Sequence, residues 1–216
     1  MNDESPERPW TEAQWEELLR RSDVRSARFG ELLETLMDHP DRDEIIEREM
    51  GWDQFEDDDV ERPWLEELNR ELTDEEMDEA DEDAERSNQE LEQLPAYARA
   101  YPFGLTVHKS LKPYCVEDQE EQDEDLVEAM ANCFTIAVKL AGAHTFGYDD
   151  HSLCGNIVCC KRSQEAAESC LRALQALRDR GVVPADVCEP LIQECAEVLR
   201  LVQEHIAELR SRVWWQ

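Results

Sequence analysis

The sequence has little glycine and no long uninterrupted apolar segment. Only 7 of its 216 residues are glycine, and neither a phosphate-binding loop nor a dinucleotide-binding fingerprint occurs. No apolar run approaches the roughly 20 residues that a membrane-spanning helix needs, so we expect no membrane partner. The first ten residues contain neither the basic region nor the apolar region of a signal peptide, and we therefore expect a cytoplasmic protein.

Catalytic signatures are missing as well. The chain has no G-x-S-x-G nucleophile motif and no pair of inward Glu-x-x-His motifs of the kind that ferritin-like di-iron bundles use. We expect a protein that is not an enzyme. A hydrolase or transferase site around His144, His151 and His205 stays open as an alternative.

Basic residues are scarce, with 22 lysines and arginines against 54 acidic residues and a formal charge of −32. Because contacts to phosphates need lysine or arginine, we expect no direct binding to nucleic acid. The charge is uneven: residues 1–128 carry a net −30 and residues 129–216 a net −2. Adaptation to high salt would make both halves acidic, so it explains the near-neutral second half poorly.

Cysteine is absent before Cys115, and all eight cysteines follow from there. No C-x-x-C pair occurs, and the sequence shows no signal peptide, so we expect reduced thiols rather than a disulfide framework. Four of these cysteines occupy apolar heptad positions and are predicted to lie in one core as small hydrophobic side chains: Cys133, Cys160, Cys188 and Cys195.

Apolar residues at alternating spacings of four and three predict three long helices in the C-terminal half. These cover 123–142, 152–180 and 184–213, with Gly142 and Gly181 as the expected ends of the first two. Residues 96–114 supply a fourth, irregular element with a kink or break near Pro102 and Gly104. The sequence therefore predicts an antiparallel four-helix bundle over 96–216.

The N-terminal half is predicted to form a set of short acidic helices. Residues 1–72 make up this region, with helices predicted at 11–21, 23–38, 41–50 and 63–71. Residues 73–95 are predicted as an acidic linker, because like charges four residues apart oppose a stable isolated helix. The fold class is thus all-α, with a partly disordered acidic linker between an acidic N-terminal region and the bundle.

One loop of the bundle concentrates residues that bind metals. His144, Asp149, His151 and Cys154 lie between two predicted helices and form a chemically reasonable ligand set for a transition metal. The same residue types also serve in a tight structural loop, in which Asp150 or Ser152 caps the next helix. A metal- or thiol-binding bundle is therefore the alternative function, and no other cofactor is expected.

The favoured function is that of a non-catalytic interaction or adaptor protein whose acidic N-terminal region contacts a basic protein partner. The candidate contact residues are acidic or aromatic, and are Asp57, Asp58, Asp59, Trp64, Trp214 and Trp215. For the two C-terminal tryptophans we favour a second interpretation, in which they pack against the N-terminal helices, the region that carries the other four tryptophans.

Overall fold

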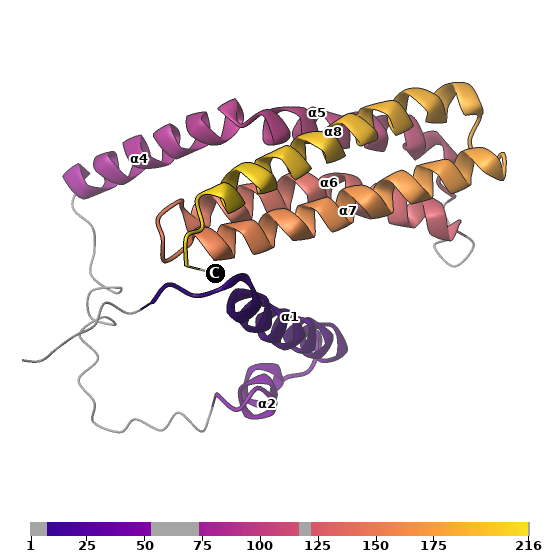
Figure 1. The fold of residues 1–216 in the computed structure, drawn as a ribbon. Coiled ribbons are helices and arrows are strands. Elements are labelled where there is room, and N and C mark those ends of the chain that lie inside the picture. Colours follow the sequence, from indigo (N-terminus) through magenta and orange to yellow (C-terminus); the bar gives the residue numbers. More distant parts are fainter. Residues whose placement is uncertain (1–7, 53–73, 117–121, 216) are drawn as a thin grey trace, which may run out of the picture. The chain divides into compact units, whose positions relative to one another are not determined.

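The computed structural model describes residues 8–52, 74–116 and 122–215, and all regular structure in these residues is helical (Figure 1). The helices, in chain order, are α1 (Glu12–Thr35), α2 (Arg42–Glu49), α4 (Asp74–Gln93), α5 (Pro95–Leu111), the 3-10 helix η1 (Lys112–Tyr114), α6 (Glu124–Phe146), α7 (Leu153–Asp179) and α8 (Ala185–Ser211). The predicted all-α class is confirmed.

Helices α5, α6, α7 and α8 form a bundle in which each helix packs against two neighbours. Helix α6 packs against α5 and α7, and α8 completes the ring by packing against α7 and α5. Short connections join α6 to α7 and α7 to α8, so these neighbours run antiparallel (Figure 1). The predicted C-terminal four-helix bundle is confirmed.

The ends of the bundle helices follow from local chemistry. The Asp123 side chain accepts hydrogen bonds from the backbone N–H groups of Asp125 and Leu126, at 3.0 and 3.3 Å, and so begins α6. Gly142 does not end this helix as predicted, because α6 continues to Phe146 and stops at Gly147, whose φ is +85°. Only a residue that tolerates a left-handed backbone fits that position.

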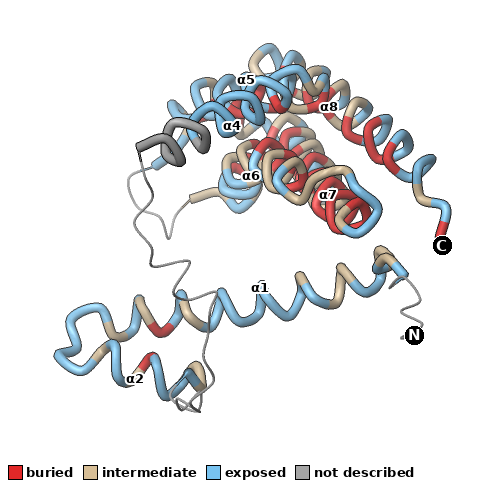
Figure 2. The backbone as a smooth tube through the Cα atoms, turned by 90° about the vertical axis from the view of Figure 1, so that its left-hand side faces the viewer, coloured by how far each residue is buried: buried red, intermediate tan, exposed pale blue. Residues whose placement is uncertain are grey.

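The bundle interior is made mainly of leucine, alanine, valine and cysteine, and Figure 2 shows buried residues on the sides where α5–α8 face one another. The predicted apolar stripes match the buried residues along much of each helix, but at some positions the buried side is rotated about the helix axis relative to the prediction. On α7 the four-three spacing places Gln164 in the apolar stripe, but Gln164 is only partly buried, whereas the neighbouring Ser163 is fully buried and donates to the Ile136 carbonyl at 2.9 Å. Packing against two helices sets this rotation, which a one-dimensional pattern does not contain.

Helix α5 is more regular than predicted. It runs through Pro102 without a break, and the Thr106 hydroxyl donates to the Pro102 carbonyl at 2.8 Å. Gly104 permits a close helix crossing, because a Cβ atom there would lie 3.0 Å from the Cys133 carbonyl oxygen on α6. The glycine that suggested a break is therefore a packing residue.

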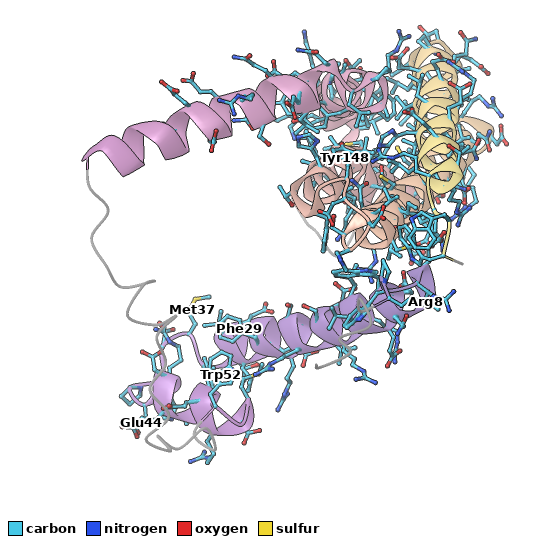
Figure 3. All side chains as sticks on the ribbon, turned by 60° about the vertical axis from the view of Figure 1, so that its left-hand side comes forward. Arg8, Phe29, Met37, Glu44, Trp52 and Tyr148 are labelled. Carbon is cyan, nitrogen blue, oxygen red and sulfur yellow. The ribbon has the colours of Figure 1, made fainter. Side chains whose placement is uncertain are left out.

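Contacts divide the chain into two compact units, one of Met1–Trp15 with Ala84–Gln216 and one of Glu16–Asp83. The predicted helices 11–21 and 23–38 merge into α1, which begins in the first unit and continues into the second, and α2 lies within the predicted 41–50. Phe29 and Trp52 bring the two helices together with ring centroids 5.6 Å apart (Figure 3), while Leu32 and Ile46 are buried. The predicted helix 63–71 lies outside the described residues.

Residues 74–93, predicted as part of an acidic linker, form the helix α4. Every residue from Asp81 to Glu90 is exposed, and Leu91 near the C-terminal end is buried. This end of α4 is anchored because Leu94 alone connects it to α5, which begins at Pro95. Propagation from a fixed helical end is less costly than nucleation, which offsets part of the repulsion between its acidic side chains.

Candidate functional site

The loop between α6 and α7 was the strongest candidate for a ligand site, and its Asp149 acts as a structural hydrogen-bond acceptor. Asp149 accepts from the backbone N–H groups of His151 and Ser152, at 2.9 and 3.2 Å. Its other carboxylate oxygen accepts from the Ser152 hydroxyl at 2.8 Å. These bonds, the Ser152 hydroxyl foremost, lower the pKa of Asp149. The residue that satisfies the turn before α7 is therefore Asp149, not Asp150 or Ser152.

The four predicted metal ligands do not form one ligand set. The His144 ring lies 2.8 Å from the Tyr148 hydroxyl, measured from Nδ1, while His151 is exposed and Cys154 is fully buried. Within the described ranges, no group of three or more histidine, cysteine, aspartate and glutamate side chains is placed to hold a metal ion. Helical geometry separates them, because His151 stays in the exposed turn while Cys154 already lies inside α7.

The C-terminal segment covers this loop. The Arg212 guanidinium donates to the Tyr148 carbonyl at 2.6 Å and lies 5.9 Å from the centre of the Tyr148 ring. The Trp214 indole N–H donates to the Asp150 carboxylate at 3.1 Å. A guanidinium and an indole thus hold the loop that the sequence suggested as a metal site, and Figure 3 marks the position of Tyr148 within it.

An aromatic cluster lies beside the loop and joins residues from both ends of the chain. Trp10 and Trp15 have ring centroids 5.3 Å apart, and Trp15 meets Phe146 edge-on at 5.2 Å. Gly155 on α7 provides room for Trp15, since a Cβ atom there would lie 3.0 Å from the indole ring. Trp215 is 2 % exposed and donates its indole N–H to the Trp10 carbonyl at 3.3 Å.

The two C-terminal tryptophans therefore differ, although they are neighbours in the sequence and were predicted to act as a pair. Trp215 packs with the N-terminal segment, and Arg8 (Figure 3) donates to its backbone carbonyl. Trp214 is 73 % exposed. Of the other predicted contact residues, Asp57, Asp58, Asp59 and Trp64 lie outside the described residues.

Sequence reasoning missed the polar residues that lie buried behind the loop. Asn156 is fully buried, donates its amide to the Gly147 carbonyl at 3.0 Å and accepts from the Cys160 thiol at 3.4 Å. Burial lowers the pKa of His205 and raises that of Tyr148. An asparagine within the apolar first turns of α7 was the available signal, because a buried amide needs fixed partners.

The cysteines are free thiols, seven of them buried and only Cys115 exposed. Several of their sulfurs donate to backbone carbonyls, and Cys195 on α8 donates to the Ala167 carbonyl on the neighbouring helix α7 at 3.4 Å. Burial raises the pKa of Cys133 and of Cys160 to about 12. At neutral pH these two sulfurs are protonated, a form that is neither a nucleophile nor a good metal ligand.

Comparison with known proteins adds no relative. No protein-family model matches the chain, and no match was found among curated proteins or solved structures. Any function of this site is therefore inferred from its geometry. The site is a loop held by hydrogen bonds beside a packed aromatic cluster.

Proposed function

We propose that the chain is a non-catalytic interaction or adaptor protein whose acidic part binds a basic protein partner. The observation that carries this proposal is the exposed acidic surface of α4. From Asp81 to Glu92 the helix has six acidic residues and one arginine, Arg86, and each of these side chains is exposed.

In the bundle, acidic and basic residues are closer to balance in number. Its acidic residues pair with arginines across and along the helices, as in Arg178–Glu189 at 2.9 Å and Arg180–Asp123 at 2.7 Å. Glu194 pairs in the same way with Arg99. Among the described residues of 1–128, exposed acidic side chains are thus concentrated on α4. The C-terminal part of the bundle, from residue 129 on, is close to electrically balanced.

A basic partner gains more from α4 than from a single surface ion pair. Acidic side chains crowded on one helix repel each other, so binding a cationic surface both forms new pairs and relieves that repulsion. Such binding weakens as salt screens the charges, because the Debye length falls to about 8 Å at physiological ionic strength. Salt sensitivity is accordingly the signature of this function.

The test uses the full chain and a fluorescent lysine peptide of about 20 residues, a simple cationic polymer. Neutralising three α4 acids, by Asp81→Asn, Glu82→Gln and Glu85→Gln, removes three charges. A matched control neutralises three exposed acids of the bundle, by Glu165→Gln, Asp186→Asn and Glu208→Gln. At about 0.5 kcal/mol for each exposed pair, the α4 variant binds the peptide about 10-fold more weakly, and the control binds like the wild type.

Equal weakening of peptide binding in both variants would mean that the affinity depends on the total charge of the protein and not on α4. The proposal would then be wrong. A deletion of residues 51–96 provides the second test, with partners captured from cell extract at low and at high salt. Retention of every salt-sensitive partner by the deletion variant would also overturn the proposal.

A further inference from the structure

Helix α6 carries two apolar stripes, and the bundle buries only one of them fully. The inner stripe includes Leu126, Cys133 and Leu140, each fully or almost fully buried. The second stripe repeats the four-three spacing on another side of the same helix, and consists of Val127, Ala131, Phe134, Val138 and Ala141. Val127 is 52 % exposed and Val138 is 64 % exposed, so the described chain leaves much of this stripe uncovered.

Helix α5 extends the stripe into a wider face. The His108 ring lies 5.8 Å from the Phe134 ring, and Gly104 lies against Phe134, which places this flank of α5 beside the outer stripe. Tyr101 and Leu105, each 50 % exposed, lie within three residues of Gly104 and on the same flank. We call the surface formed by the outer stripe, Tyr101 and Leu105 the α5–α6 face.

The end of the face near the start of α6 is hollowed. A hollow of about 630 Å³ is lined by Cys115, Val116, Gln122, Leu126, Val127, Met130 and Ala131. An apolar, partly hollow surface of this kind is typical of a protein contact, since soluble monomers rarely expose large contiguous apolar patches.

The distribution of charge restricts which kind of partner can cover this face. No charged residue occurs in α6 between Glu128 and Lys139, so the centre of the face offers no carboxylate to a basic partner. Among the described residues, α6 alone is long and apolar enough to cross a membrane, but its inner stripe is enclosed by the bundle. A chain with a formal charge of −32 is also repelled by anionic lipid surfaces.

The order of residues in the stripe is self-complementary. When two copies of α6 pair antiparallel about Phe134, Val127 meets Ala141 of the other copy, and Ala131 meets Val138. Each larger side chain thus faces a smaller one twice, which is the matching that a two-fold interface requires. The stripe spans about four helical turns and is about 21 Å long.

We propose that the α5–α6 face is the contact surface for a second copy of this chain, which pairs through antiparallel α6 helices related by a two-fold axis. This proposal is independent of the acidic partner surface on α4. It also has the opposite salt dependence: screening reduces repulsion between two strongly acidic copies, so added salt strengthens the dimer.

Sedimentation velocity of the full chain at about 1 to 100 µM tests the proposal, with a concentration-dependent dimer as the expected result. Ala131→Glu and Val138→Arg each place a charge in the interface and convert the protein to monomer, at least 10-fold weaker in self-association. Val24→Arg on α1 and Ala207→Glu on α8 are matched controls at exposed positions, 63 % for Val24, and remain dimeric.

Mixing the two interface variants gives the decisive result. In a mixed dimer the carboxylate introduced by Ala131→Glu faces the guanidinium introduced by Val138→Arg, while the symmetry-related contact keeps its native valine and alanine. The mixture therefore recovers the dimer that neither variant forms alone, which shows that both variants are folded.

A wild-type chain that stays monomeric throughout the concentration range would overturn the proposal. So would a dimer that survives both substitutions, or a mixture that stays monomeric. Flotation with neutral phosphatidylcholine vesicles tests whether a lipid membrane, and not a second copy of the chain, covers this face. A monomeric wild type that floats with the vesicles, while Val138→Arg does not, would show that lipid covers the face.

Discussion

Trp215 donates its indole N–H to the backbone carbonyl of Trp10 at 3.3 Å, and this bond joins residues 205 positions apart in the chain. It places the segment that follows α8 against the segment that precedes α1. The cluster around it contains Trp15 and Phe146, so residues from the start, the middle and the end of the sequence meet at one end of the bundle.

The first prediction concerns the two neighbouring tryptophans. Trp215→Ala removes a side chain that is 2 % exposed and is expected to lower the free energy of unfolding by about 3 kcal/mol. Trp214→Ala removes a side chain that is 73 % exposed and is expected to change it by less than about 1 kcal/mol. Urea denaturation followed by circular dichroism measures both. Similar losses from the two variants would contradict this difference in packing.

The second prediction concerns two glycines inside helices. Gly155→Ala forces a methyl group to within 3.0 Å of the Trp15 ring and 3.1 Å of Phe146, and two rigid rings must move. We expect a net loss of about 1 kcal/mol in unfolding free energy, because overpacking outweighs the better helix propensity of alanine. Gly142→Ala meets no atom within 4 Å and is expected to stabilise α6 by about 0.5 to 1 kcal/mol. Thermal unfolding of the two variants checks the opposite signs.

The third prediction concerns pH. The Arg180 guanidinium, with smaller contributions from backbone N–H groups, lowers the pKa of Asp123 against the opposing effect of burial. A carboxyl group with a lowered pKa stabilises the folded state fully above its unfolded pKa of about 4, and this contribution is lost as the pH falls through the folded pKa. Asp123→Asn keeps the helix cap but removes the charge, so its deficit in unfolding free energy at pH 7 shrinks below about pH 4.

Two further variants separate the cap of α6 from the ion pair. Asp123→Ala loses both and is expected to be about 1 kcal/mol less stable than Asp123→Asn at every pH. Asp186→Asn, an exposed acid in the first turn of α8, serves as the control. A deficit of Asp123→Asn that stayed constant from pH 7 to pH 3 would argue against the Arg180 pair as its source.

The fourth prediction concerns thiol reactivity. In the native protein at pH 8, an aromatic disulfide reagent reacts rapidly with one thiol, the exposed Cys115, while the seven buried cysteines react only after denaturation. Burial, which raises the pKa of Cys133 and Cys160 to about 12, keeps these two sulfurs in the unreactive protonated form. Cys115→Ser removes the rapid phase. A second rapid thiol in that variant would contradict the packed core.

Much of the bundle was predictable because its information is local. Apolar residues at alternating spacings of four and three specify a helix and its buried side, and Asp123 marks the start of α6 by capping chemistry. The end of α6 was predicted four residues early, at Gly142, because both glycines qualify by residue type. Only the backbone of the folded chain distinguishes them, with φ positive at Gly147.

The candidate metal ligands show the same limit of local information. His144, Asp149, His151 and Cys154 are close in sequence, but α6 and α7 fix their directions separately, and each meets a different environment. No local pattern indicated that Arg212 and Trp214 hold the loop, since those contacts span 64 residues.

Periodicity and composition were enough to specify an all-α chain, a C-terminal bundle with thiols in its apolar stripes, and a concentration of negative charge before residue 129. These features were predictable because they depend on residues that are near one another in the sequence. Packing in three dimensions selected Ser163 over Gln164 for the core and Trp215 over Trp214 for burial, and it left α6 with a second apolar stripe on the surface. Such choices depend on which helices pack together and at what rotation, and that is set by contacts between residues far apart in sequence.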